Sequence, residues 1–202
     1  RLADPTLPME EAFSQQLKEE KLELPAGQFA LFMNSMYAVD AYVRDYFRKA
    51  VLDALLAEKL PVTVFGEGWE KYSCGDEHSL RREPAVPFAL SFERITKAHV
   101  LLNVSPIFNR GMHDRVPAGM ANHAVVLTDE NPYLRRTFTD GKELLFYSLE
   151  KPDTLCEQAE RTLTDVRLRE KIAASAYETF EREYTWKRRA EQILAFAEEV
   201  EA

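Results

Sequence analysis

The chain has 202 residues, of which 46% are hydrophobic and 30% charged, a composition that is typical of a packed core and excludes an intrinsically disordered chain. Its net charge of −8 argues against general nucleic-acid binding, because that activity requires a basic face that neutralises phosphates. A local group of cations that serves one phosphorylated ligand is compatible with this charge.

Cysteine usage and hydropathy indicate a reduced, cytoplasmic protein. Cys74 and Cys156 lie far apart, and neither has the spacing of a metal site or of a disulfide scaffold. No apolar run approaches the roughly 20 residues of a membrane span. The chain begins with Arg1 and carries no segment that resembles a signal peptide, so we expect it to be one part of a longer protein.

Residues 1–26 are predicted to be a linker or packing helix. Met9, Phe13 and Leu17 recur at every fourth position, which places them on one helical face. The sequence Leu-Pro-Ala-Gly at 24–27 ends this segment, since proline and glycine interrupt helices.

Residues 27–184 alternate between predicted strands and helices. Short apolar runs predict strands over 29–33, 62–65, 99–102, 124–127 and 144–147. Helical periodicity predicts helices over 39–55, 88–97, 114–122 and 131–138. This alternation favours a parallel sheet covered on both faces, and right-handed crossovers then give a doubly wound α/β domain.

The tail is predicted to be helical, with a last helix over 185–202. Thr185 is a plausible N-cap for it. Five apolar residues at helical spacing are expected to face inward: Trp186, Ala190, Ile193, Ala197 and Val200.

Ligands of doubly wound domains bind beyond the carboxyl ends of the strands, so the residues after each predicted strand are the candidates. Asn34 and Ser35 follow the first strand and open a helix, where backbone amides attract anions; simple capping explains them equally well. Gly66 and Gly68 follow the second strand and allow close approach to a flat ligand, and Trp69 could line a pocket, although turn glycines are common there. A dinucleotide-binding Gly-x-Gly-x-x-Gly motif is absent.

The third strand leads into a polar loop from Asn103 that holds Arg110, His113, Asp114 and Arg115 just before a predicted helix. Arginine and histidine side chains at a helix start are suited to bind a diphosphate. A solvated loop with an Arg–Asp surface pair is the alternative.

The fourth strand ends at Thr128 and Asp129. Either residue could cap the next helix, and Asp129 could instead accept hydrogen bonds from sugar hydroxyls. The sequence contains no Ser-His-Asp order, no metal-type histidine cluster and no Walker loop.

The sequence resembles the carboxyl-terminal domain of glycosyltransferases with the GT-B fold, and more narrowly the branch related to spore-maturation glycosyltransferases. The resembling segments spread over roughly 29–196, and the most specific part runs from Asp114 to Asp129. The segments are 64–69, 101–103, 111–116, Met120, 124–129, 138–143, Tyr147, 172–173 and 184–186.

This resemblance implies a Rossmann-like donor domain that faces a separate acceptor domain across a cleft, with the last helix crossing back to that domain. The implied donor is a nucleotide-diphosphate sugar, and no metal is obligatory. His113 and Arg115 would face the diphosphate, with Arg115 and Arg110 neutralising the charge on the leaving nucleotide. Residues 66–69 would lie near the base, and Asp129 near the sugar.

The sequence departs from the broader family at four positions. Where many retaining members carry two glutamates eight residues apart, this chain has Arg110 and Ala118. Pro117 replaces a usual aromatic residue and His123 a usual glycine. The missing glutamates favour an alternative, a non-catalytic nucleotide-binding or interaction module of the same fold. A structural domain that assembles through its apolar helices is a third hypothesis.

Overall fold

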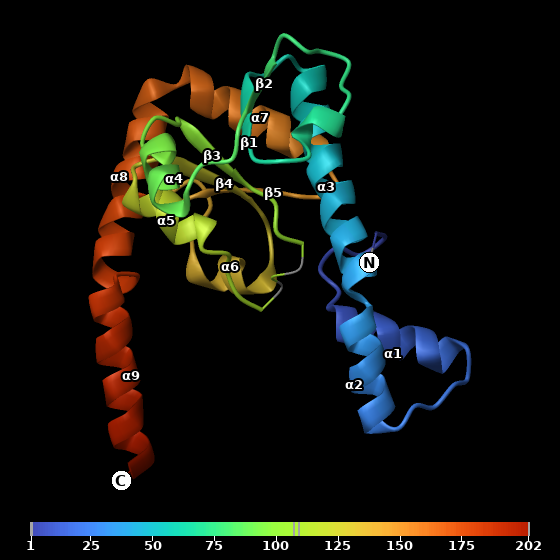
Figure 1. The fold of residues 1–202 in the computed structure, drawn as a ribbon. Helices are drawn as coiled ribbons and strands as arrows, with labels where there is room; N and C mark the ends of the chain where they lie inside the picture. The colour runs from blue at the N-terminus through green and yellow to red at the C-terminus, as the bar shows by residue number, and fades with distance from the viewer. Residues whose placement is uncertain (1, 107, 109, 202) are drawn as a thin grey trace.

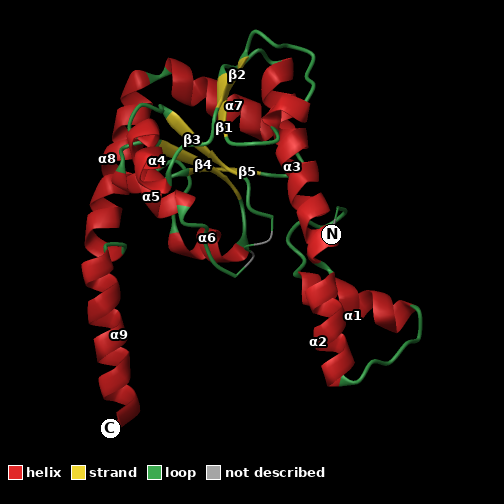
Figure 2. Cartoon of the chain, in the orientation of Figure 1, coloured by secondary structure: helices red, strands yellow, loops and turns green. Residues whose placement is uncertain are grey.

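The computed structural model describes residues 2–106, 108 and 110–201 (Figure 1). Ile107 and Asn109, which belong to the predicted polar loop, lie outside the described residues, as do Arg1 and Ala202 of the two predicted end segments. The architecture is α/β, with parallel strands flanked by helices (Figure 2), which confirms the predicted fold class.

The elements follow the predicted alternation over most of the chain. Their bounds are α1 Met9–Glu19, α2 Ala26–Ser35, α3 Tyr37–Ala57, β1 Val62–Phe65, the 3-10 turn Trp69–Lys71, β2 Leu80–Glu83, α4 Phe88–Ile95, β3 Val100–Asn103, α5 Arg115–Ala121, β4 Val125–Asp129, α6 Pro132–Thr137, β5 Leu145–Tyr147, α7 Pro152–Thr164, α8 Val166–Glu183 and α9 Trp186–Glu201. Within the described chain, no helix combines the length and the apolar character that a membrane span requires.

The strands form two parallel sheets. In the larger sheet, β4 lies between β3 and β5, with Val100 opposite Val125 and Leu127 opposite Leu145. In the smaller sheet, β1 pairs with β2. The sequence pattern did not predict β2, because its residues Leu-Arg-Arg-Glu lack the apolar run that marks a buried strand.

The core has two faces on either side of β4, whose residues are all buried. Val125 and Leu127 pack into one cluster with Phe47 of α3 and Leu155 of α7. Val126 points to the other face and packs with Met120 of α5 and other residues of α5, α6 and α8. This alternation follows from the two-residue period of a strand, and it makes β4 the centre of the fold.

The predicted strand over 29–33 is wrong, because these residues belong to the helix α2. The run contains alanine, leucine, phenylalanine and methionine but no β-branched residue, so its composition suits a helix. Short apolar runs do not by themselves distinguish a strand from a helix. The rings of Phe29 and Phe32 both lie against Phe13 of α1, which holds α1 and α2 together.

The last helix is present, but its predicted inward face is wrong. The backbone N–H of Arg188 donates to Thr185 Oγ1 at 3.3 Å, which confirms the N-cap. Trp186, however, is 90% exposed, and Ile193 and Val200 are exposed as well. The helix leaves the body of the molecule after α8 and extends away from it (Figure 1), so its apolar residues find no core in this chain.

Helix α5 lies close against the sheet because it carries Gly119. A Cβ at this position would overlap Cγ2 of Val126 and lie 3.0 Å from Cδ2 of Leu101. At the end of α5, His123 adopts a left-handed conformation with φ 56°, and its ring stacks on Tyr177 of α8 at 4.3 Å between centroids. The glycine that the family usually has here would adopt this conformation without steric cost.

We predict that Gly119→Ala lowers the free energy of unfolding by about 1–3 kcal/mol, because the added methyl group overpacks the contact between α5 and β4. Urea denaturation monitored by circular dichroism measures the change. Gly27→Ala in α2 is the matched control, since a Cβ there meets nothing within 4 Å. Equal stability of Gly119→Ala and the parent chain would contradict the close packing of α5.

Candidate functional site

The carboxyl ends of β3, β4 and β5 meet in a network centred on Asn103. The Asn103 side-chain amide donates to Thr128 Oγ1 at 2.9 Å, and the Tyr147 hydroxyl donates to the Asn103 carbonyl at 2.9 Å. The Ser105 hydroxyl donates to Asn103 Oδ1 at 3.0 Å. All four residues are buried, so this edge of the sheet is a rigid platform for the loops above it.

Arg115 is attached to this platform from the start of α5. Its Nη1 donates to Asn103 Oδ1 at 2.6 Å, and its Nη2 lies 3.3 Å from His113 Nε2. The backbone N–H of Arg115 donates to His113 Nδ1 at 3.2 Å, and the same ring nitrogen lies against the carboxylate of Asp114. Burial lowers the pKa of His113, and the positive charges of Arg115 and Arg48 lower it further, which favours the neutral ring.

Asp129 is the buried carboxyl group of the site. It is 3% exposed, and its Oδ1 accepts a hydrogen bond from the Ser105 backbone N–H at 2.8 Å. Burial raises the pKa of Asp129 to about 7, although the Ser105 amide and the Arg115 charge act in the opposite direction. The group therefore changes its charge near neutral pH instead of being permanently ionised.

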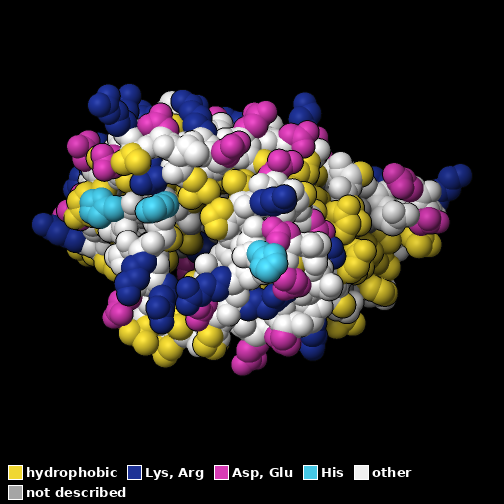
Figure 3. Space-filling view, turned by 90° about the horizontal axis from the view of Figure 1, so that it is seen from above, with side chains coloured by type: hydrophobic (Ala, Val, Ile, Leu, Met, Phe, Trp, Pro, Cys, Tyr) yellow, Lys and Arg dark blue, Asp and Glu magenta, His cyan; other side chains and the backbone are white. Residues whose placement is uncertain are grey.

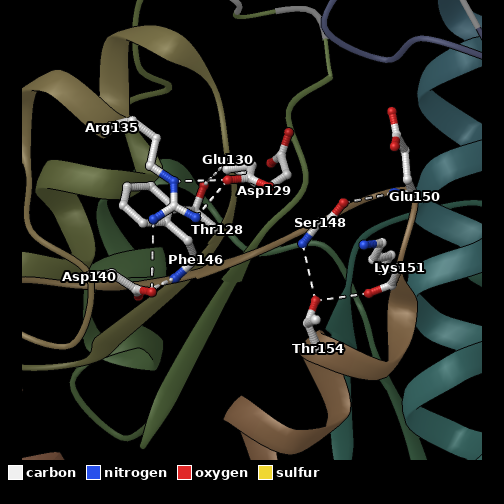
Figure 4. A network of polar contacts seen from close by, with 10 residues as sticks. All are labelled: Thr128, Asp129, Glu130, Arg135, Asp140, Phe146, Ser148, Glu150, Lys151 and Thr154. Carbon is white, nitrogen blue, oxygen red and sulfur yellow. Dashed lines mark hydrogen bonds and ion pairs between the residues drawn. The ribbon is translucent and has the colours of Figure 1, made fainter.

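A cavity of about 300 Å³ opens beside Asp129, at the carboxyl ends of β4 and β5. Its polar lining includes Glu130, Arg135, Ser148 and Glu150, which surround the strand ends in Figure 4. Arg135 donates to Glu130 at 2.6 Å, so these two charges are paired. The sequence reasoning missed Ser148 and Glu150, although they directly follow the predicted strand over 144–147.

The N-terminal segment also borders this cavity. Pro5, which is buried, and Thr6 line it together with Pro106. Asp4 Oδ1 accepts hydrogen bonds from the Thr6 backbone N–H at 2.9 Å and from its hydroxyl at 2.7 Å, which orders the turn. The segment predicted as a linker thus reaches the candidate site.

Asn131 positions the loop between β3 and α5. Its side chain accepts from the Leu134 backbone N–H at 2.8 Å and so caps α6. Its amide donates to the carbonyl groups of Phe108 at 2.7 Å and Gly111 at 3.2 Å. The prediction that Thr128 or Asp129 caps this helix is therefore wrong; the cap lies two residues beyond Asp129.

Two other predicted residues of the loop are oriented toward solvent. Arg110 is exposed and forms an ion pair with Glu11 of α1. Asp114 precedes α5 without a side-chain cap and pairs with His113. The loop therefore brings His113 and Arg115 to Asn103, whereas Arg110 lies with α1.

Gly66, Gly68 and Trp69 follow β1, as predicted. Both glycines have positive φ, 122° and 89°, so this turn requires their conformational freedom. The Trp69 indole N–H donates to the Phe65 carbonyl at 3.2 Å, and the ring packs edge-to-face against Tyr72. These contacts assign Trp69 to the packing around the smaller sheet.

Asn34 and Ser35 do not follow a strand. They lie in the last turn of α2, where the Ser35 hydroxyl donates to the Phe32 carbonyl at 2.7 Å. The prediction that these two residues follow a strand and open a helix is therefore wrong.

Comparison with known proteins agrees with the α/β fold described above. A family model described as glycosyl transferase-like matches residues 44–195. The chain belongs to this family. The matched segment contains β1 to β5 and the whole strand-end network, and the fold matches Rossmann-like domains of GT-B glycosyltransferases.

Solved structures share the fold at low sequence identity. HepE (Alr3699) of Anabaena, solved in complex with UDP-glucose, is 11% identical, with a TM-score of 0.62 over 74% of this chain and 44% of that one. TarM is 12% identical, with a TM-score of 0.56 over 74% of this chain and 31% of that one. The chain thus spans less than half the length of either protein. A comparison with curated proteins found no match.

The raised pKa of Asp129 predicts a pH-dependent stability. The unfolded carboxyl loses its proton near pH 4, whereas the folded one keeps it until about pH 7, so the contribution of Asp129 to stability falls as the pH rises between these values. We expect Asp129→Asn to be more stable than the parent chain at pH 8, by at most about 4 kcal/mol, and to lose this advantage at pH 4. Urea denaturation at both pH values measures it; a difference independent of pH would contradict the assignment.

Proposed function

We propose that this chain is the donor-binding half of a glycosyltransferase that moves a sugar from a nucleotide-diphosphate sugar to an acceptor. The observation that carries the proposal is the placement of Arg115 and His113 at the carboxyl ends of the strands, where a cavity lined by Asp129, but not by these two residues, also opens. Membership of a glycosyl transferase-like family and the UDP-glucose complex of the structurally similar HepE support it. The narrower likeness to spore-maturation glycosyltransferases is part of this proposal.

In this proposal Arg115 and His113 bind the diphosphate. Arg115 is oriented by Asn103 and keeps guanidinium donors close to the start of α5. A preorganised cation of this kind stabilises the charge that develops on the departing nucleotide, and such stabilisation often contributes more to catalysis than any other effect. His113 contributes its imidazole ring as a polar contact, and the proposal includes no obligatory metal ion.

The cavity beside Asp129 would hold the sugar. Its volume of about 300 Å³ and its lining of carboxylate, amide and hydroxyl groups suit a ligand with several hydroxyl groups. Asp129 has one oxygen occupied by the Ser105 amide and would present the other to a sugar hydroxyl. Gly66 to Trp69 would lie near the base, a role that rests on the resemblance alone.

A second domain is the partner that this proposal requires. Exposed apolar residues gather on α2 and the first half of α3, and again on α9. In Figure 3 one group of apolar side chains lies to the right of the centre, further apolar side chains lie along the lower left edge, and acidic and basic side chains are interspersed among them. We infer that an acceptor domain covers these helices, since such apolar patches mark interaction surfaces.

A non-catalytic binding module of the same fold is the second candidate function. Arg110 and Ala118 stand where many retaining members have glutamates, and Arg110 pairs with α1 instead of facing Asn103. Turnover by a longer protein that contains this chain distinguishes the two functions. We expect it to release nucleoside diphosphate from a nucleotide sugar in a coupled spectrophotometric assay when an acceptor mixture is added. Donor binding without turnover under any acceptor would favour the binding module.

The first test of the donor site uses the chain itself. We expect uridine, guanosine or thymidine diphosphate to bind in calorimetric titration and Arg115→Ala to weaken this binding by roughly 10- to 100-fold, because a charge-assisted hydrogen bond is lost. Arg167→Ala, an exposed cation on α8, should bind as the parent does. EDTA should leave the affinity unchanged.

Arg115 also donates a hydrogen bond to Asn103, so its substitution can change the stability of the fold as well as ligand binding. The stability of each variant is therefore measured in parallel. Arg115→Lys keeps the charge and is expected to show an intermediate affinity, since lysine lacks the bidentate fork. Parent-like binding by a folded Arg115→Ala would exclude Arg115 from the donor site.

A further inference from the structure

A turn near the start of the chain, residues 4–7, forms one wall of the cavity beside Asp129. Pro5 and Thr6 of this N-terminal turn line the cavity, although they lie far from Asp129 in the sequence. Pro5 is buried, so the turn is packed onto the molecule. On other sides the cavity is lined by Asp129 at the end of β4 and by Ser148 and Glu150, which follow β5 (Figure 4). A ligand in this cavity therefore meets both the strand ends and the N-terminal turn.

The N-terminal turn has a defined shape because its own hydrogen bonds close it. Asp4 Oδ1 accepts a hydrogen bond from the Thr6 backbone N–H at 2.9 Å and another from the Thr6 hydroxyl at 2.7 Å. The Leu7 backbone N–H donates to the Asp4 carbonyl at 3.3 Å. An aspartate that binds the backbone two residues further on stabilises a turn in this way. The wall is thus an ordered surface that a ligand can pack against.

Contacts of the following helix hold the N-terminal turn at the cavity. Glu11 of α1 forms an ion pair with Arg110 in the loop between β3 and α5. Exposed ion pairs contribute little by themselves. Phe13 of α1 adds aromatic contacts with Phe29 and Phe32 of α2, with ring centroids 5.3 and 6.1 Å apart. Helix α2 leads into α3, whose buried face belongs to the core, so the turn is connected to the body of the fold.

The cavity suits a sugar and is separate from the candidate diphosphate ligands. Pro5, Pro106 and Leu149 contribute apolar surface, and the strand ends contribute carboxyl and hydroxyl groups. A sugar has apolar C–H faces and polar edges, and binding sites commonly combine apolar walls with a few polar groups that fix orientation. Arg115 and His113 do not line this cavity. A wall here would contact the sugar of the donor and not its diphosphate.

We propose that the N-terminal turn is a wall of the sugar subsite and determines which sugars the chain accepts. The inference rests on the proposed function, because it takes the cavity beside Asp129 as the place of the sugar. It adds a segment that lies outside residues 44–195, the part of the chain that matches the family model. Pro5 and Thr6 bound a volume of about 300 Å³, so the size of the side chains in the turn limits the sugar that fits.

The first test fills the cavity from the side of the turn. Thr6 is exposed, so the fold should accommodate a larger side chain there. The probes are the diphosphates of uridine, guanosine and thymidine and their glucose conjugates, in calorimetric titration of the whole chain. We expect Thr6→Trp to weaken binding of the glucose conjugate roughly 10- to 100-fold and to leave binding of the diphosphate unchanged. Thr164→Trp, at an exposed threonine that ends α7, is the control and should bind both as the parent does.

A second variant loosens the wall without filling the cavity. Asp4→Ala removes the acceptor of both hydrogen bonds from Thr6, so the turn loses its defined shape. We expect the glucose conjugate to bind severalfold more weakly to this variant and the diphosphate to bind as it does to the parent. Parent-like binding of the conjugate by both Asp4→Ala and Thr6→Trp would overturn the inference.

NMR of the isotope-labelled parent chain tests the contact without any substitution. The backbone amide signals of Thr6 and Leu7 should shift when the glucose conjugate is added and should not shift when the diphosphate alone is added. The signal of Lys21, which lies beyond α1, is the internal reference. Signals of the turn that do not respond to a bound conjugate would place the sugar elsewhere and exclude the wall.

The outcomes separate this inference from the proposed function. Diphosphate binding that is lost in Arg115→Ala, together with parent-like binding of the conjugate by Thr6→Trp, overturns the wall and leaves the donor site intact. Equal weakening of diphosphate and conjugate in a folded Thr6→Trp also overturns it, because the effect is then not specific to the sugar. A parent chain that binds none of the probes overturns both proposals. Selective loss of the conjugate supports the wall.

Discussion

Asn103 is the residue on which the arrangement of the site depends. Its carbonyl, its amide and its side-chain oxygen each hold a different partner: Tyr147 at the end of β5, Thr128 at the end of β4, and Arg115 at the start of α5. A buried polar side chain of this kind is stable only when its hydrogen bonds are satisfied, so the register of the strands and the position of the arginine are fixed together. The sheet and the candidate ligand-binding group are thereby one structural unit.

Burial gives the site its electrostatic character. Arg115 and Asp129 lie on the same platform, yet they are not directly paired by a hydrogen bond; Asn103 binds the first and the Ser105 amide binds the second. Burial disfavours the charged form of each group, which lowers the pKa of Arg115 and raises that of Asp129. An anion that enters beside Arg115 meets a guanidinium group that forms no ion pair with a carboxylate in the described part of the chain.

Much of the larger sheet could be predicted from the sequence. The runs before Asn103 and Thr128 are apolar and bounded by polar residues, and both proved to be parallel strands whose ends meet. Strand β2 was missed because its side chains are mostly charged, and the run over 29–33 was misassigned because strand and helix share an apolar composition at that length. The placement of the candidate site residues was predicted correctly where the preceding strand was. Asn103, His113 and Arg115 follow the correctly predicted β3 and meet, whereas Asn34 and Ser35 follow the misassigned run and lie on α2.

Other features of the site depend on contacts between distant segments, which periodicity does not encode. Pro5 and Thr6 line the cavity with Asp129, and Glu11 binds Arg110 across the molecule. The exposure of Trp186 could not be predicted either. Helical spacing predicts an apolar face, but it does not show whether the chain supplies a surface that covers this face.

The turn at His123 helps to fix helix α5 and thereby preorganises Arg115 for ligand binding. His123 takes a left-handed conformation that costs a non-glycine residue about 1 kcal/mol or more, and its stacking on Tyr177 attaches the end of α5 to α8. Val116 and Met120, in the body of α5, pack with Ala176 of the same helix α8. Helix α5 is therefore held along its whole length, and Arg115 at its start is preorganised. The entropy of ordering this side chain is lost when the protein folds, so a ligand that binds it does not lose that entropy again.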